Sequence, residues 1–231
     1  MNACSVVVLA PHPDDEVLGC GGTIARLAEA GADVTVIAVA ADVPPLYPAG
    51  IDAQVRAEAR AAHEILGVTA TEFLGFPSVE LARLSVAELN GAVQERIHRA
   101  KPDIVLLPFP DRHIDHRAVF DAGMVATRPI GDAAEISVVA MYETISETFW
   151  NAPGAEPTFA PNWVVDITDT IERKTTAFAE YASQIQEYPA ARSTQALEAL
   201  ALFRGSQAAM EYGEAFQIVR MLTTASSAWP L

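Results

Sequence analysis

The sequence is poor in cysteine and has no long apolar segment. Only Cys4 and Cys20 occur among 231 residues, and they do not form a Cys-x-x-Cys pair. We therefore expect two small buried apolar residues rather than a disulfide framework or a redox motif. The chain has no charged and apolar leader and no apolar run near the roughly 18 residues of a membrane span. These absences predict a protein of the reducing cytoplasm, neither secreted nor inserted into a membrane.

Basic residues are also scarce. Fifteen lysines and arginines stand against 30 aspartates and glutamates, so the formal net charge is −15 with histidine neutral. Such a charge repels nucleic acid and anionic membranes, and we expect neither as a partner. A neutral or cationic small molecule is not repelled by this charge, and we expect such a molecule as the partner.

Apolar, strand-like runs alternate with amphipathic, helix-like segments along the chain. The expected strands are Val6–Leu9, Val34–Val39, Glu72–Leu74, Ile104–Leu107, Ile136–Tyr142 and Trp163–Ile167, and the expected helices are Ile24–Ala30, Gln54–Leu66, Val86–Arg99, Ile171–Gln186 and Thr194–Ala209. This alternation predicts an α/β fold with a Rossmann-like, mainly parallel sheet flanked by helices. We expect a single domain over residues 1–231, with a core at 5–145 completed by a C-terminal strand and helices at 162–223.

A run of chemically active residues follows the first expected strand: Ala10-Pro11-His12-Pro13-Asp14-Asp15-Glu16. One imidazole and two adjacent carboxylates at a strand exit can hold a divalent cation and leave a carboxylate free to accept a proton from water. This combination is typical of a metal hydrolase. Taken alone, it could also be a histidine filling a gap and two carboxylates capping the next helix.

A second cluster, Asp111-Arg112-His113-Ile114-Asp115-His116, follows the strand expected at 104–107. In doubly wound sheets the strand order reverses beside the first strand, so the first and fourth strands are neighbours and their carboxyl ends open the ligand crevice. Topology therefore predicts that the two clusters meet. The alternative, a pair of histidines satisfied at a helix start, has less support beside the first cluster. A facial His/Asp/His set with open positions suits zinc first, although other divalent ions accept the same ligands.

The run Gly19-Cys20-Gly21-Gly22 does not indicate dinucleotide binding. The fingerprint Gly-x-Gly-x-x-Gly needs a glycine at position 24, where this chain has Ile24, and it should follow the strand directly. We expect these glycines to let the helix pack closely beneath the metal site.

The motifs together resemble the PIG-L/LmbE-like superfamily of zinc-dependent N-acetylglucosamine-type deacetylases. The resemblance is carried by Pro11–Glu16 with Leu18-Gly19 and Gly21-Gly22, and by His113-x-Asp115-His116; it extends to Arg56-x-Glu58, Leu66-Gly67, Lys174, Ser183-Gln184 and Glu214-Ala215-Phe216. It implies that the metal ligands are His12, Asp15 and His116. It further implies that Asp14 is the general base and that His113 stabilises the oxyanion, with Asp115 orienting it. Self-association into a homo-oligomer is implied as well.

These implied roles are chemically coherent. Zinc with three protein ligands can lower the pKa of a bound water to about 7, and Asp14 can accept its proton and pass it to the leaving amine. A protonated His113 would give the oxyanion a second positive partner.

Two residues are weaker candidates for substrate contact. Arg56 is explained equally well as a solvated helical arginine and as a clamp for a substrate hydroxyl. Tyr142 ends the fifth expected strand, where a crevice residue would lie, although core packing is the commoner fate of a strand tyrosine. The segments Pro44–Asp52 and Ala152–Asn162 are expected to edge the crevice.

The expected function is hydrolysis of an N-acetyl, or other N-acyl, group from an amino sugar in a small glycoside, a thiol-cofactor precursor or a natural-product intermediate. One alternative is an amidase of a thiol conjugate. Another is a metal-dependent sugar-binding module without catalysis. The intact Asp14 argues against the binding module, since a binder has no need of a free base.

Overall fold

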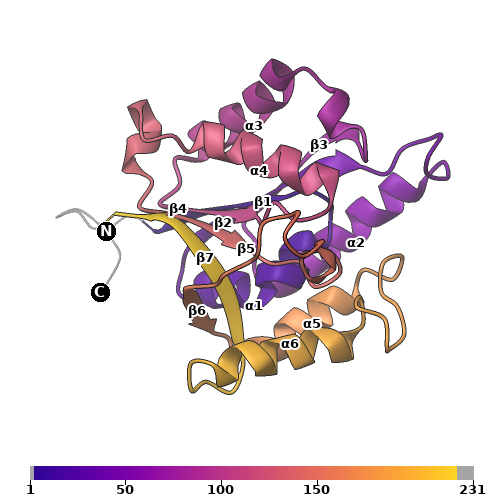
Figure 1. Cartoon of the computed structure of the whole chain (residues 1–231), viewed down its shortest axis with the longest axis vertical. Helices are drawn as coiled ribbons and strands as arrows, with labels where there is room; N and C mark the ends of the chain where they lie inside the picture. Colours follow the sequence, from indigo (N-terminus) through magenta and orange to yellow (C-terminus); the bar gives the residue numbers. More distant parts are fainter. Residues whose placement is uncertain (1–2, 223–231) are drawn as a thin grey trace.

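The computed structural model describes residues 3–222, and its centre is a seven-stranded sheet in the order β3-β2-β1-β4-β5-β7-β6 (Figure 1). The strands are β1 (Ser5–Ala10), β2 (Asp33–Ala41), β3 (Ala70–Pro77), β4 (Ile104–Pro108), β5 (Val138–Tyr142), β6 (Trp163–Asp166) and β7 (Gly213–Met221). The first five strands are parallel, and β7 runs antiparallel to both β5 and β6. The predicted α/β fold with a mainly parallel sheet is confirmed.

Helices cover both faces of the sheet. They are α1 (Asp15–Glu29), α2 (Ile51–Leu66), α3 (Val86–Ala100), α4 (Ile114–Ala126), α5 (Ile171–Ala179) and α6 (Thr194–Ser206), with short 3-10 turns at Leu81–Arg83, Gly131–Glu135 and Thr148–Trp150. Helices α3 and α4 lie on one face, and α1, α2, α5 and α6 lie on the other (Figure 1). Within residues 3–222, no helix has the length and apolar character needed to cross a membrane.

The core follows the alternation of side chains along the central strands. Val6 and Val8 join one buried cluster, whereas Val7 and Leu9 join the cluster on the opposite face. Because β1 is covered on both faces, its sequence is a continuous apolar run, as expected of a strand in a parallel sheet.

Helix α1 begins at Asp15, nine residues before the expected start at Ile24. The glycine-rich run lies inside this helix, which bends at Cys20 (φ −144°, ψ 24°). A Cβ at Gly19 would lie 2.1 Å from the Tyr142 ring, and one at Gly22 would lie 2.8 Å from Ile167. Close packing therefore requires these glycines, as predicted, and offsets their low helix propensity.

Three other elements differ from the prediction. Helix α4 and strand β7 were not predicted as elements, and α5 ends at Ala179 rather than continuing to Gln186. The backbone N–H of Ser183 donates to the Glu58 carboxylate (3.1 Å), so it is not available for a helical hydrogen bond. Ser85 caps the start of α3, since its hydroxyl accepts from the Glu88 N–H.

Candidate metal and catalytic site

The two clusters predicted to meet do so at the carboxyl edge of the sheet. Residues 12–15 follow β1, residues 113–116 begin α4 after β4, and β1 pairs directly with β4. The order of strands reverses at this pair, with β2 and β3 on one side and β5 on the other. The switch point therefore brings chain segments about a hundred residues apart into one site.

Three donor atoms, one each from His12, Asp15 and His116, lie close together in this site. The Asp15 Oδ2 lies 3.2 Å from the His12 Nδ1 and 3.3 Å from the His116 Nε2. Donors bound to one zinc at about 2.0–2.1 Å and at tetrahedral angles are roughly 3.3–3.4 Å apart. The predicted set His12, Asp15 and His116 therefore fits a metal ion of this size.

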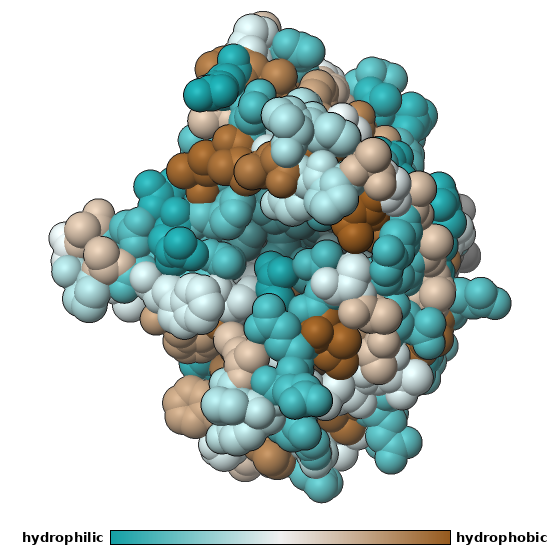
Figure 2. Space-filling view, turned by 90° about the vertical axis from the view of Figure 1, so that its right-hand side faces the viewer, coloured by the Kyte–Doolittle hydropathy of each residue, from teal (hydrophilic) through white to brown (hydrophobic). Residues whose placement is uncertain are grey.

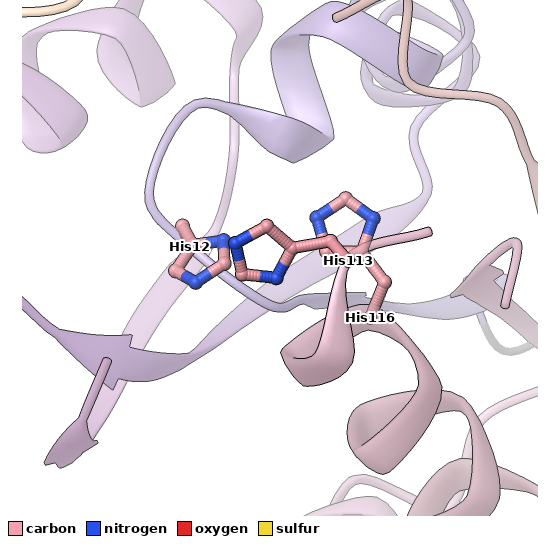
Figure 3. Close-up of side chains that lie close together, drawn as sticks. All are labelled: His12, His113 and His116. Atoms are coloured by element: carbon pink, nitrogen blue, oxygen red, sulfur yellow. The ribbon is translucent and has the colours of Figure 1, made fainter. Parts of the chain in front are cut away.

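His113 lies beside this set. Donor atoms of His12, His113 and His116 all lie within 4.8 Å of one another, and their rings face a common space (Figure 3). Asp15 is fully buried, and its Oδ1 makes no hydrogen bond within the described part of the chain. An unpartnered buried carboxylate oxygen beside three imidazoles favours a cation at this place.

The charges of the buried carboxylates also favour a cation in this site. Burial lowers the pKa of His116, but the carboxylates of Asp15 and Asp111 outweigh it and raise the pKa to about 10. Burial likewise opposes protonation of His12, while Asp115 and Asp15 raise its pKa to about 9. Where no metal is bound, the surrounding carboxylates therefore favour the protonated form of both imidazoles. A metal ion would take the place of those protons.

Asp111 holds the second cluster in place. Its Oδ2 contacts the His116 Nδ1 (3.0 Å) and accepts from the Thr148 hydroxyl (3.0 Å), and its Oδ1 accepts from the His113 N–H (3.0 Å). Metal-binding histidines commonly donate their second ring N–H to a carboxylate, which fixes the ring. No role was predicted for Asp111, although the sequence places its carboxylate just after a buried strand and five residues before His116.

Asp115 has a different partner from the one expected. Its Oδ2 accepts from the Val79 N–H (2.6 Å) and contacts the His12 Nε2 (3.0 Å). Between Asp115 and His113 the contact is made by the backbone instead: the Asp115 N–H donates to the His113 Nδ1 (3.2 Å). In this structure the Asp115 side chain therefore orients His12.

His113 is a neutral hydrogen-bond donor in this arrangement. Burial, together with the charges on His12 and His116, lowers its pKa to about 4. Because its Nδ1 accepts the backbone hydrogen bond, its Nε2 carries the proton. Both observations favour a neutral His113 over the protonated form expected from the sequence, and its Nε2–H can still donate to a carbonyl oxygen.

Asp14 differs from its neighbour in backbone and surroundings. Its φ of 121° lies in a region that non-glycine residues rarely adopt, and such strain costs on the order of 1–3 kcal/mol. Its N–H donates to Glu16 (3.2 Å), which also accepts from Tyr181 (2.5 Å) and contacts His63 (3.0 Å). Burial raises the pKa of Asp14 to about 8, against the effect of Arg192 and together with that of Asp15.

A crevice of about 320 Å³ opens over these groups (Figure 2). Figure 2 shows this face as a hydrophilic hollow with hydrophobic residues at its margin. The lining residues are His12, Pro13, Asp14, Asp42, Tyr47, Ile51, His113, Ser183, Gln184 and Arg192. The expected edge Pro44–Asp52 contributes Tyr47 and Ile51. The facing wall is formed by residues 183–192 rather than by Ala152–Asn162, which lines a separate pocket.

Neither predicted substrate residue lies in the crevice wall. The Arg56 Nε donates to Asp52 (2.7 Å), and its guanidinium lies 4.9 Å from the centre of the Phe73 ring. Tyr142 is fully buried, and its hydroxyl donates to the Leu9 carbonyl (2.9 Å). Arg192, which the sequence analysis did not single out, is the arginine that lines the crevice.

Comparison with known proteins connects this site to amide hydrolysis. The model of a family described as GlcNAc-PI de-N-acetylase, PIG-L, matches residues 7–127. The diacetylchitobiose deacetylase of Thermococcus kodakarensis is 28% identical over 223 residues, which cover 93% of this chain and 82% of that protein. An N,N'-diacetylchitobiose deacetylase from Pyrococcus horikoshii superposes with a TM-score of 0.74 at 26% identity, covering 94% of this chain and 84% of that one.

The same fold also occurs with another reaction. The 4-carboxy-2-hydroxymuconate hydratase of Pseudomonas putida superposes with a TM-score of 0.76 at 22% identity, covering 97% of this chain and 100% of that one. The fold alone therefore does not determine the reaction, which must be argued from the residues of the site.

Proposed function

Since this chain belongs to the PIG-L family of de-N-acetylases, we propose that it removes an N-acetyl group from an amino sugar in a small glycoside. The observation that carries the proposal is the donor set His12, Asp15 and His116, spaced for one metal ion and adjacent to the carboxylate of Asp14. These three residues would hold a divalent metal, with zinc the first choice for two imidazoles and a carboxylate. When bound, such a metal polarises a carbonyl and makes water a stronger nucleophile near neutral pH.

The residues of the chain supply the proton transfers. Asp14 accepts a proton from the water whose oxygen forms a bond to the amide carbon. The carbon–nitrogen bond then breaks, and Asp14 returns the proton to the leaving amine, so the products are acetate and a free amino sugar. The Nε2–H of His113 donates to the carbonyl oxygen as negative charge develops on it. Asp115 and Asp111 orient His12 and His116.

The role of His113 has its own test. His113→Gln should retain the metal and lose on the order of 10²–10³-fold in kcat, the usual cost of one oxyanion donor. If this variant turns over like the wild type, His113 takes no part in the reaction.

The decisive experiment is a substrate panel. The purified, zinc-loaded protein is incubated with N-acetylglucosamine, N-acetylated disaccharides, aryl glycosides and an N-acyl thiol conjugate, and acetate and free amine are both measured. Asp14→Asn with its metal retained is the matched control. Release of equal amounts of acetate and amine by the wild type alone supports the proposal.

The panel also separates the alternatives. Turnover confined to the thiol conjugate would indicate an amidase of that class, and tight sugar binding without release of acetate would indicate a binding module. Self-association, which the family resemblance implies, stays a prediction that light scattering can measure.

A further inference from the structure

Arg192 lies in the crevice wall, directly beside the proposed base. Its Nη1 is 3.4 Å from the Asp14 Oδ2. That oxygen is buried and makes no hydrogen bond to any residue within 3–222, whereas the Arg192 side chain remains 24% exposed to the crevice. The guanidinium is thus the polar group that faces an otherwise unpartnered oxygen of Asp14.

The guanidinium is held in place by two other segments. Its Nε donates to the hydroxyl of Ser146, which follows β5, and its Nη1 donates to the Gln184 side chain (3.2 and 3.1 Å). Gln184 in turn donates to the Ser183 hydroxyl (3.1 Å), and that hydroxyl donates to Glu58 on α2 (2.5 Å). These contacts fix the position of Arg192 relative to the sheet and to α2.

The Arg192 contact differs from the buried pair of Arg204 and Glu143. Arg204 and Glu143 form two hydrogen bonds of 2.8 and 2.6 Å, which engage both carboxylate oxygens. The recorded contact of Arg192 is with a single oxygen of Asp14. Asp14 lines the crevice, and its contact with Arg192 is made by Oδ2, which leaves the second oxygen, Oδ1, outside that contact.

We propose that Arg192 is a positioning residue for Asp14: by holding Oδ2 against the crevice wall, it directs Oδ1 toward the water that attacks the amide. This inference rests on the proposed hydrolytic function and assigns no direct contact with the substrate. A displacement of a reacting group by about 1 Å can cost on the order of 10²-fold in rate, so the orientation of one carboxylate is enough to matter.

Kinetics of position 192 provide the first test. Arg192→Gln should lower kcat by roughly 10- to 100-fold with KM and metal content close to wild type, and Arg192→Lys should retain more activity than Arg192→Gln. Added methylguanidinium should restore part of the kcat of Arg192→Ala. Arg173→Gln is the matched control, because Arg173 is also anchored by a carbonyl and a carboxylate but faces Ile65 and Glu29 instead of the crevice; it should have wild-type kcat and KM.

A double variant tests whether Arg192 acts through Asp14. In an Asp14→Asn background, Arg192→Gln should cause little further loss, because the carboxylate that it positions is already gone. Equal losses in both backgrounds would overturn the proposal. A rise in KM with unchanged kcat would also overturn it, since Arg192 would then bind the substrate itself.

A crystal structure of metal-loaded Arg192→Gln gives a readout that does not depend on finding a substrate. The Asp14 side chain should lose the single orientation that it has beside Arg192. An Asp14 carboxylate that is ordered and unmoved in this variant would refute the positioning role even if no amino sugar were hydrolysed, whereas failure of the substrate panel alone would refute only the hydrolytic function.

Discussion

Replacement of Lys174 by methionine should destabilise the protein strongly, because it leaves a buried carboxylate without its counterion. Lys174 on α5 and Glu214 on β7 are each 3% exposed, and the Lys174 Nζ lies 2.5 Å from the Glu214 Oε1. Glu214 also accepts from the N–H groups of Gly22 (2.9 Å) and Thr23 (2.7 Å), which follow the bend of α1 at Cys20. One carboxylate thus joins β7 and α5 to the helix that begins with Asp15.

The size of the effect follows from the burial. Removing one partner of a buried ion pair costs about 3–5 kcal/mol, since the other charge is left in a medium that solvates it poorly. For a chain of this length each kcal/mol lowers the midpoint of thermal unfolding by roughly 2–4 °C, so the expected decrease is about 6–20 °C. The methionine side chain retains most of the volume of lysine, and a cavity adds little.

Urea unfolding of the metal-saturated protein, followed by circular dichroism, measures this loss. Arg99→Met is the matched control, because Arg99 pairs with Glu72 at the surface and exposed pairs contribute little. The double variant Lys174→Met/Glu214→Gln should recover part of the lost stability, since it removes the uncompensated charge. If Lys174→Met is as stable as Arg99→Met, or the double variant is less stable than the single one, the charge argument is wrong.

Three further predictions concern the site. Replacing any one of His12, Asp15 and His116 by alanine should remove most of the bound zinc, while Asp14→Asn should keep it; elemental analysis measures this, and full zinc content in His116→Ala would contradict the assignment. Asp111→Ala should weaken metal binding by about 10- to 100-fold in a competition titration with a chelator, since Asp111 fixes the His116 ring. An uncharged acetamido sugar should release acetate faster than its 6-phosphate, because the net charge of −15 and the Asp42 carboxylate in the crevice repel phosphate; the opposite preference would refute this reasoning.

The sequence was sufficient to predict the parts of the site that depend on topology. Parallel strands separated by helices, with a polar cluster after the first and the fourth, led to the expectation that both clusters meet at the switch point. That expectation needed no knowledge of side-chain positions. The strand pairing of β1 with β4 and the spacing of the donors around Asp15 agree with it.

The substrate side could not be predicted in the same way. Tyr142 does end β5, but alternation along the strand turns its ring toward Gly19 and the core instead of toward the crevice. Arg56 is four residues after Asp52 on α2, a spacing at which helical ion pairs form, and the structure contains that pair. Arg192 comes from the irregular segment between α5 and α6, whose path is determined by contacts with Glu16, Glu58 and Ser146 and not by any periodic pattern.

The run Asp14-Asp15-Glu16 illustrates how backbone geometry divides three adjacent carboxylates among three tasks. Asp15 begins α1 and turns toward the imidazoles, Glu16 is buried against Tyr181 and His63, and Asp14, at φ 121°, is directed to the crevice beside Arg192. In a regular helix or strand, successive side chains diverge by a fixed angle, which predicts their directions from the sequence; the backbone at Asp14 follows neither geometry, so its direction could not be predicted. The strain at Asp14 is tolerated because Glu16 accepts its N–H and is itself held by two buried partners. Asp14, the residue that we propose as the base, is thus the one whose backbone departs from regular structure, and its neighbours stabilise that departure.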